Sequence, residues 1–216
     1  MESLLRWPLT TASRSEARYH PFVDERLRKW DEKFARGDEL HAFAPSMPLP
    51  DAIRGLAPGL ALDLACGAGR HAIYLAEQGW RVQALDGSRV GIDRMLDEAR
   101  RRGVEGRIEA RVGDLESDSF TLEPDAFDLV CDFYFLHRPL FAQIRRAVRP
   151  GGLFVAAIHV EDAAGSEAPH SFLLAPGELR ALVGGWGWEV VHAREGASSE
   201  TGHRHATAEI VARRPR

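Results

Sequence analysis

An apolar stretch that ends in an acidic residue and then breaks into a two-glycine turn constrains this chain most. Residues 61–70 read ALDLACGAGR, so Asp63 stands in the apolar run and Gly67 and Gly69 follow it. Glycines permit the tight turn and the close backbone approach found where a strand passes into a ligand-binding helix. A second apolar run ends at Asp86, 19 residues after Gly67, where a carboxylate could accept both hydroxyls of a ribose. The two segments together predict a site for a nucleotide-like ligand.

Short apolar runs alternate with segments of helical periodicity from residue 51 onward. This alternation predicts an α/β fold built on a doubly wound sheet with helices on both faces. In an open parallel sheet a ligand lies beyond the carboxyl ends of the strands, so the loops that follow the strands are expected to form the site. We expect strands near residues 60–64, 81–85, 107–112, 127–131, 152–158, 188–194 and 205–212.

An N-terminal extension precedes the sheet-forming part of the chain. The pattern of residues 21–37 predicts a helix that ends at Gly37, with one apolar face formed by Phe22, Leu27, Trp30 and Phe34. Three prolines follow before residue 51, and they predict a linker without a helix. We therefore expect residues 1–50 to be an arm, helix and linker that cover the active site, and residues 51–216 to be the ligand-binding domain.

Charge and cysteine content exclude several classes of protein. A net charge of -4 gives no broad basic face for a nucleic-acid backbone, so a small substrate is favoured. The two cysteines, Cys66 and Cys131, cannot build a disulfide framework or a four-cysteine zinc site, which predicts a protein of the reducing cytoplasm. The histidines at 203 and 205 lack the carboxylate-histidine spacing of a recognised metal helix, so we expect no metal. No run approaches the roughly 20 apolar residues that a membrane span needs, so we expect no membrane anchor.

The acidic residue ahead of the glycines distinguishes between the nucleotide-like ligands that such a turn could bind. Nicotinamide enzymes usually carry only apolar residues there, whereas this chain has Asp63 four positions before Gly67. The segment resembles the S-adenosylmethionine-binding motif of class I methyltransferases, and the tract over residues 69–80 resembles small-molecule members, including the tellurite-resistance methyltransferases. The likeness covers residues 58–160 and is also carried by Asp86-Gly87-Ser88, Gly113-Asp114-Leu115, the FDLV of residues 127–130 and the RPGG of residues 149–152.

This resemblance implies S-adenosylmethionine as the cofactor and a Rossmann-like sheet of seven strands. The last strand, near residues 205–212, should run antiparallel between the fifth and the sixth. By the same resemblance, Asp86 would bind the ribose hydroxyls and Asp114 the adenine amine. The expected cofactor-binding residues are Asp63, Ala65, Gly67, Gly69, Arg70, Asp86, Gly87, Ser88, Asp114, Leu115 and Cys131.

Aromatic and basic residues follow the fourth strand, on the ligand side of the sheet. Tyr134 and His137 can form a wall of the acceptor pocket, and His203 and Arg204 are expected to reach the same edge from the loop after the sixth strand. These four residues are the candidate catalytic residues. Together with Arg138 they would make a basic mouth, which favours small anionic acceptors.

We expect methyl transfer to a small molecule such as a thiol, a chalcogen oxyanion or a similar small anion. The positive sulfonium already activates the methyl group, so holding the nucleophile in line supplies much of the rate enhancement. A soft anion needs no general base, whereas an oxygen or nitrogen nucleophile could pass a proton to His137, His203 or Tyr134. The sequence leaves this choice open.

Three other classes of protein are weighed against this expectation. A non-catalytic S-adenosylmethionine-binding regulatory protein would share the cofactor motif, and a nicotinamide-dependent oxidoreductase would share the glycine turn. A nucleic-acid methyltransferase usually carries an Asn/Asp-Pro-Pro-aromatic tetrad after the fourth strand. Residues 131–134 read CDFY at that place, which disfavours such an activity.

Overall fold

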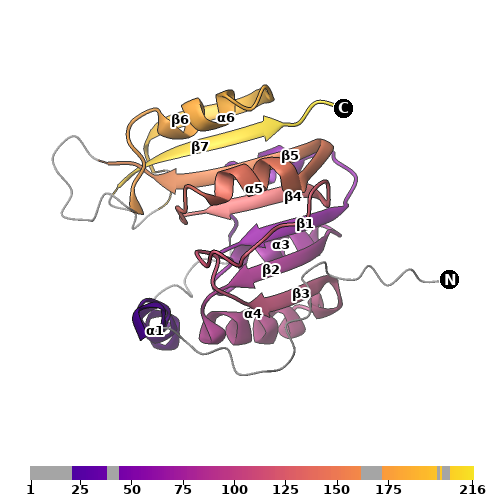
Figure 1. The fold of residues 1–216 in the computed structure, drawn as a ribbon. Coiled ribbons are helices and arrows are strands. Elements are labelled where there is room, and N and C mark those ends of the chain that lie inside the picture. The colour runs from indigo at the N-terminus through magenta and orange to yellow at the C-terminus, as the bar shows by residue number, and fades with distance from the viewer. Residues whose placement is uncertain (1–20, 38–43, 162–171, 199, 201–204) are drawn as a thin grey trace.

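One mixed sheet organises the molecule (Figure 1). The computed structural model describes residues 21–37, 44–161, 172–198, 200 and 205–216. In these residues the sheet has seven strands in the order β3-β2-β1-β4-β5-β7-β6. The strands are β1 (Leu60–Leu64), β2 (Arg81–Asp86), β3 (Ile108–Val112), β4 (Phe127–Phe133), β5 (Val148–His159), β6 (Glu189–Ala197) and β7 (Ala206–Arg213).

Strand direction confirms the expected topology. β1 pairs in parallel with both β2 and β4, β2 with β3, and β4 with β5. β7 runs antiparallel between β5 and β6, as the resemblance implied. The strand order reverses between β1 and β4, so the carboxyl ends of these two strands mark the switch point at which open α/β sheets bind ligands.

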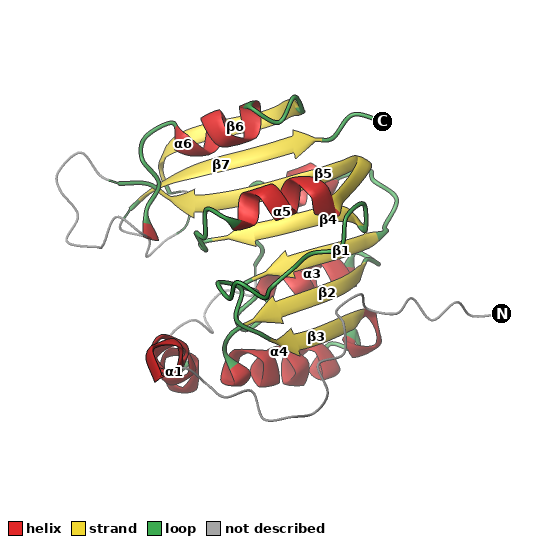
Figure 2. Cartoon of the chain, in the orientation of Figure 1, coloured by secondary structure: helices red, strands yellow, loops and turns green. Residues whose placement is uncertain are grey.

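Helices cover both faces of this sheet (Figure 2). α2, α3 and α4 pack on one face around residues such as Ile73 and Met95, while α5 and α6 pack on the other around Ile144 and Val183. The helices are α1 (Pro21–Arg36), α2 (Leu49–Ile53), α3 (Arg70–Glu77), α4 (Arg89–Arg101), α5 (Leu140–Ala147) and α6 (Glu178–Gly184), with a 3₁₀ turn at Glu105–Arg107. No helix in the described ranges is long and apolar enough to cross a membrane.

Two local expectations for the N-terminal region were wrong. The linker expected up to residue 50 overlaps α2, which begins at Leu49 because Pro50 lies in the first turn, where a proline removes no helical hydrogen bond. Trp30 was placed on the apolar face of the first helix, yet its side chain is 44% exposed. It stacks on Phe34, which alone of the two is buried.

Candidate cofactor and acceptor site

Every second residue of the turn after β1 has a left-handed backbone conformation. Ala65 has φ +51°, Gly67 +53° and Gly69 +83°. A Cβ on Gly69 would lie 2.1 Å from Cγ of Met95, so a larger residue does not fit there. A non-glycine residue such as Ala65 is strained in this region, and such strain concentrates at functional sites. The turn delivers the backbone N–H groups at the start of α3 to the carboxyl edge of the sheet.

Asp86, at the end of β2, ties this turn to the next one. Its Oδ2 accepts the Gly67 N–H at 2.7 Å, and its Oδ1 accepts the Ser88 N–H at 2.7 Å. The Ser88 hydroxyl in turn accepts the Gly91 N–H at 3.0 Å and caps α4. Asp86, which is expected to bind the ribose hydroxyls, therefore joins the loop after β1 to the loop after β2.

Two buried carboxyl groups stand at the switch point without hydrogen bonds. Asp63 and Asp132 are each 1% exposed, and no oxygen of either side chain is hydrogen-bonded among the described residues. Burial raises the pKa of Asp63 to about 7, although the Ala72 amide opposes the shift. Burial, together with the charge of Asp63, raises the pKa of Asp132 well above its usual range. Buried polar groups without partners cost stability, which is typical of a site built for a ligand.

The third expected cofactor loop follows β3. The Gly113 N–H donates to the Asp86 carbonyl at 2.9 Å, which draws this loop against the end of β2. Oδ1 of Asp114 accepts the Glu116 N–H at 3.0 Å and an N–H of Arg26 at 2.7 Å. Leu115 is buried in the core on the α5 side. The three loops of the expected cofactor site thus converge at one edge.

On the acceptor side, Tyr134 joins residues that are far apart in the sequence. It has φ +61°, a strained conformation for an aromatic residue, and its N–H donates to the Ala157 carbonyl at 2.8 Å. Its hydroxyl donates to Glu200 at 2.9 Å, and Arg70 donates to the same carboxylate at 2.9 Å. The Arg70 guanidinium also lies 5.5 Å from the centre of the Tyr134 ring.

The contacts within the cluster of Arg70, Tyr134 and Glu200 determine the protonation states of Tyr134 and Glu200. Burial and the Glu200 charge raise the pKa of Tyr134 to about 12, so its phenol is neutral. Burial alone would raise the pKa of Glu200, but the Ser46 hydroxyl and the Arg70 guanidinium outweigh it and lower that pKa. Glu200 is therefore ionised and Tyr134 is a hydrogen-bond donor near neutral pH.

Sequence reasoning missed Asp132 and Glu200. Asp132 is an acid near the end of a largely apolar strand, the same signal that identified Asp63, so the sequence did carry it. Glu200 lies in the polar segment between β6 and β7, and only the fold brings it to Arg70. The ring of His159 lies 4.8 Å from that of Tyr134 and 5.7 Å from that of His205, which extends the cluster along the edge of β5.

Of the four basic residues expected to form the basic mouth, the structure describes His137 and Arg138. Arg138 makes two hydrogen bonds to Glu178 at 2.6 and 2.8 Å and a third to the Leu173 carbonyl, so its charge is compensated. His137 is half-buried, and its carbonyl accepts the Leu140 N–H at the start of α5. His203 and Arg204 lie outside the described residues.

The cysteines near the site are packing residues. Cys66 and Cys131 are free and buried, and burial, with the nearby acidic side chains, raises the pKa of both thiols. Neither is a thiolate near neutral pH, which agrees with treating neither as a nucleophile. Within the described residues, no group of three or more His, Cys, Asp or Glu side chains could hold a metal ion.

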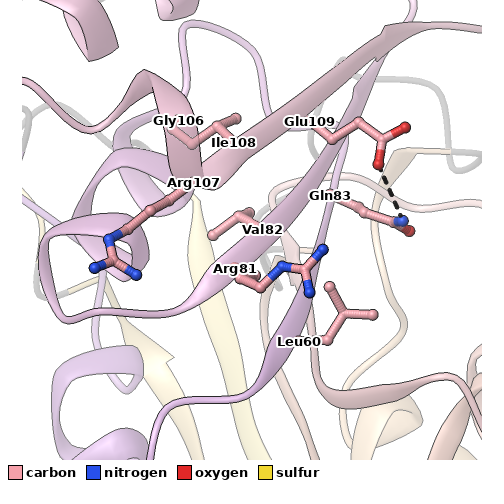
Figure 3. A pocket seen from close by; sticks show the side chains of 8 residues that line it. All are labelled: Leu60, Arg81, Val82, Gln83, Gly106, Arg107, Ile108 and Glu109. Atoms are coloured by element: carbon pink, nitrogen blue, oxygen red, sulfur yellow. Dashed lines mark hydrogen bonds between the residues drawn. The ribbon is translucent and has the colours of Figure 1, made fainter. Parts of the chain in front are cut away.

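A small pocket lies at the opposite end of the strands (Figure 3). It has a volume of about 120 Å³ and is lined by first residues of strands, among them Leu60, Arg81 and Ile108. The Gln83 amide donates across it to Glu109 at 3.5 Å. Because ligands of this fold bind at the carboxyl ends, this pocket is not the candidate site.

Comparisons with known proteins indicate the family to which this fold and site correspond. Residues 61–152 match the family described as a methyltransferase domain. Over 142 residues, or 63% of this chain, the sequence is 30% identical to Hemagglutinin 1 of Eikenella corrodens, but the match covers 46% of that protein. The chain thus spans less than half the length of this curated relative.

Solved structures show the same fold. TehB from Haemophilus influenzae superposes with a TM-score of 0.68 at 20% identity, over 86% of this chain and 67% of that one. The 1,6-didemethyltoxoflavin-N1-methyltransferase of Burkholderia thailandensis, solved with its substrate and S-adenosylhomocysteine, gives 0.66 at 20% identity over 90% and 88%. Residues 61–152 are therefore a methyltransferase domain of the class I, S-adenosylmethionine-dependent type. The glycine turn and the unpartnered Asp63 carboxyl fit that cofactor.

Proposed function

We propose that this chain transfers the methyl group of S-adenosylmethionine to a small-molecule acceptor. The observation that carries the proposal is the convergence, at the carboxyl edge of the sheet, of three cofactor loops with the Arg70–Glu200–Tyr134 cluster. The cofactor supplies a sulfonium whose methyl group is open to attack by a lone pair, while the C–S electrons pass to sulfur and leave S-adenosylhomocysteine. The chain has to hold two molecules in line and exclude water.

We assign the cofactor side to the loops after β1, β2 and β3. Asp86 would accept the ribose hydroxyls and Asp114 the adenine amine, while the turn at Gly67 and Gly69 lets the backbone approach closely. The buried carboxyl of Asp63 would face the positive end of the cofactor, and a positive charge nearby favours its ionised form. Ala65, Arg70, Gly87, Ser88, Leu115 and Cys131 complete the proposed contacts.

The acceptor side favours a nucleophile that needs no general base. Tyr134 is neutral and already donates its proton to Glu200, and the lowered pKa of Glu200 makes it a weak base. This suits a thiolate or a chalcogen oxyanion, whose lone pair is ready to attack. An oxygen or nitrogen nucleophile would need His137 or His203 to accept its proton.

Three further points support a small acceptor and a reducing compartment. The Burkholderia enzyme binds a small molecule on the same fold, and the net charge of -4 disfavours a polyanion as substrate. Both cysteines are free thiols, which suits the cytoplasm. The rival is a non-catalytic protein that binds S-adenosylmethionine for regulation.

The test is a panel of acceptors incubated with S-adenosylmethionine, in which release of S-adenosylhomocysteine is measured. We expect turnover with a thiol, selenite or tellurite, and less with amines, catechols or ribosomal RNA. Tyr134→Phe should lower turnover with little change in cofactor affinity, whereas Tyr74→Phe, a matched control on α3, should change neither. Cofactor binding without turnover on any acceptor would favour the regulatory protein, and turnover confined to RNA would overturn the small-molecule proposal.

A further inference from the structure

One face of α1 rests on the loops that we assign to the cofactor (Figure 1, indigo helix at the carboxyl ends of β2 and β3). Leu27 covers Gly87 so closely that a Cβ there would lie 2.3 Å from its Cδ2. Two turns further along α1, Phe34 covers Gly67, where a Cβ would lie 2.8 Å from its Cζ. Leu27 and Phe34 are seven residues apart, so they share one side of the helix.

Polar contacts from the same side reach the second and third loops. Oδ1 of Asp31 accepts the Val90 N–H at 3.1 Å and the Ser88 hydroxyl, which places a carboxylate at the N-terminus of α4. Arg26 donates to Oδ1 of Asp114 at 2.7 Å and also pairs with Glu116. Every loop of the proposed cofactor site is therefore in contact with α1.

Arg26 is the residue of α1 that hydrogen-bonds Asp114, the carboxylate proposed to bind the adenine amine. Both donors that Asp114 receives from described residues, the Arg26 guanidinium and the Glu116 N–H, converge on Oδ1. They orient the carboxylate and leave Oδ2 as the atom to meet the adenine amine. The side chains of Arg26 and Asp114 are 27% and 18% exposed, so the pair is partly shielded from solvent.

We propose that Arg26 is a cofactor-positioning residue and that α1 closes over bound S-adenosylmethionine. This inference rests on the proposed function. The cofactor enters and leaves when α1 moves off the three loops. Once bound between the loops and α1, it contacts both and holds α1 in place. Binding and docking of the helix are then linked, so that each stabilises the other.

The first experiment compares two arginines of the same helix. Arg26→Met removes the contact to Asp114, while Arg28→Met, the matched control, removes only an exposed pair with Glu32 on the other side of α1. Dissociation of S-adenosylhomocysteine is followed by stopped-flow, with affinity from calorimetry. We expect Arg26→Met to release the product about threefold to tenfold faster, and Arg28→Met to behave like the unaltered protein.

A second measurement needs no variant. Hydrogen exchange of the amides over residues 25–36 should slow by about tenfold or more when S-adenosylhomocysteine binds, because closing reactions then outcompete opening ones. Equal dissociation rates for both variants, or exchange in α1 that bound ligand leaves unchanged, would overturn the proposal.

The outcomes also separate this proposal from the one on which it rests. Tighter binding by Arg26→Met, or faster exchange in α1 on binding, would show that the helix competes with the cofactor, and would overturn closure while the cofactor assignment stands. Absence of any calorimetric binding of S-adenosylhomocysteine would overturn both.

Discussion

Two aspartates of β4, four residues apart, have opposite environments: one is hydrogen-bonded and the other is buried without a partner among the described residues. Asp128, at the amino end, accepts the Leu60 N–H at 2.7 Å and pairs with Arg149. Asp132, near the carboxyl end, is 1% exposed and has neither oxygen hydrogen-bonded within the described chain. One strand thus carries a carboxylate that stabilises the fold and a carboxyl that costs it stability.

The same contrast extends to neighbouring elements. At the amino edge Asp125 pairs with Arg214 at 2.6 Å. At the carboxyl edge the described residues leave Asp63 as buried and as unpartnered as Asp132. Ala65 and Tyr134 adopt left-handed conformations there that are strained for their residue types, whereas Asp125 at the amino edge is left-handed but of a type that tolerates it. The amino edge is therefore arranged for stability, whereas the carboxyl edge is arranged for a ligand and destabilises the free protein.

The largest expected effect is a loss of stability as pH rises. The usual pKa of Asp63 is 3.8 and the folded protein raises it to about 7. The folded state then binds this proton more tightly than the unfolded state, so the free energy of unfolding falls as pH rises between these two values. From pH 5 to pH 8 this amounts to about 3 kcal/mol. In urea unfolding we expect Asp63→Asn to remove this part of the fall, and Asp132→Asn to remove the part that Asp132 contributes through its own raised pKa.

The control for this prediction lies at the other end of the sheet. Asp128→Asn should lower the free energy of unfolding at both pH values by about 1–3 kcal/mol and keep the difference between them. Burial lowers the pKa of His71, which opposes the fall below pH 6.5, so the quantity to compare is the difference between variants. The same fall in Asp63→Asn and the unaltered protein would break the contrast between the two edges.

Cofactor affinity should depend on one edge only. Asp86→Asn replaces an acceptor of two backbone N–H groups and, as proposed, of the ribose hydroxyls. Losing hydrogen bonds to a charged acceptor costs about 1.5–3 kcal/mol, so calorimetry should give a Kd for S-adenosylhomocysteine raised about tenfold to more than a hundredfold. The matched change at the amino edge, Asp125→Asn, suits the φ of +53° there and should leave the Kd unaltered. Equal dissociation constants for Asp86→Asn and Asp125→Asn would show that Asp86 does not bind the cofactor.

The smallest effect is expected at Arg138, which the sequence placed in a basic mouth. Its pair with Glu178 is partly exposed, so Arg138→Ala should cost less than about 1 kcal/mol of stability. With an acceptor identified from the panel, kcat and KM should stay within about twofold, because the structure uses this residue to join α6 to the loop after β4. A tenfold loss of kcat/KM would contradict this and indicate that Arg138 contributes to the acceptor site.

Much of the sheet followed from the sequence because its signals are local. Apolar runs bounded by glycines predicted the strands, and the antiparallel position of β7 came from the resemblance; both are confirmed. The acceptor side did not follow, because Arg70, Tyr134 and Glu200 are 64 to 130 residues apart and meet only through the order of the strands. Leu27 and Phe34 face the domain as expected, whereas Trp30 is exposed, because the rotation of α1 against α4 decides this and the periodicity of α1 does not set it.

Thermal unfolding with added ligands tests the central claim, that the carboxyl edge binds S-adenosylmethionine, most directly. At a ligand concentration a hundredfold above the Kd, binding to the folded state contributes about 2.7 kcal/mol, which raises Tm by roughly 5–10 °C in a chain of this size. The account predicts this rise with S-adenosylmethionine and with S-adenosylhomocysteine, and none with a nicotinamide dinucleotide. A rise with the dinucleotide and none with S-adenosylhomocysteine would contradict it.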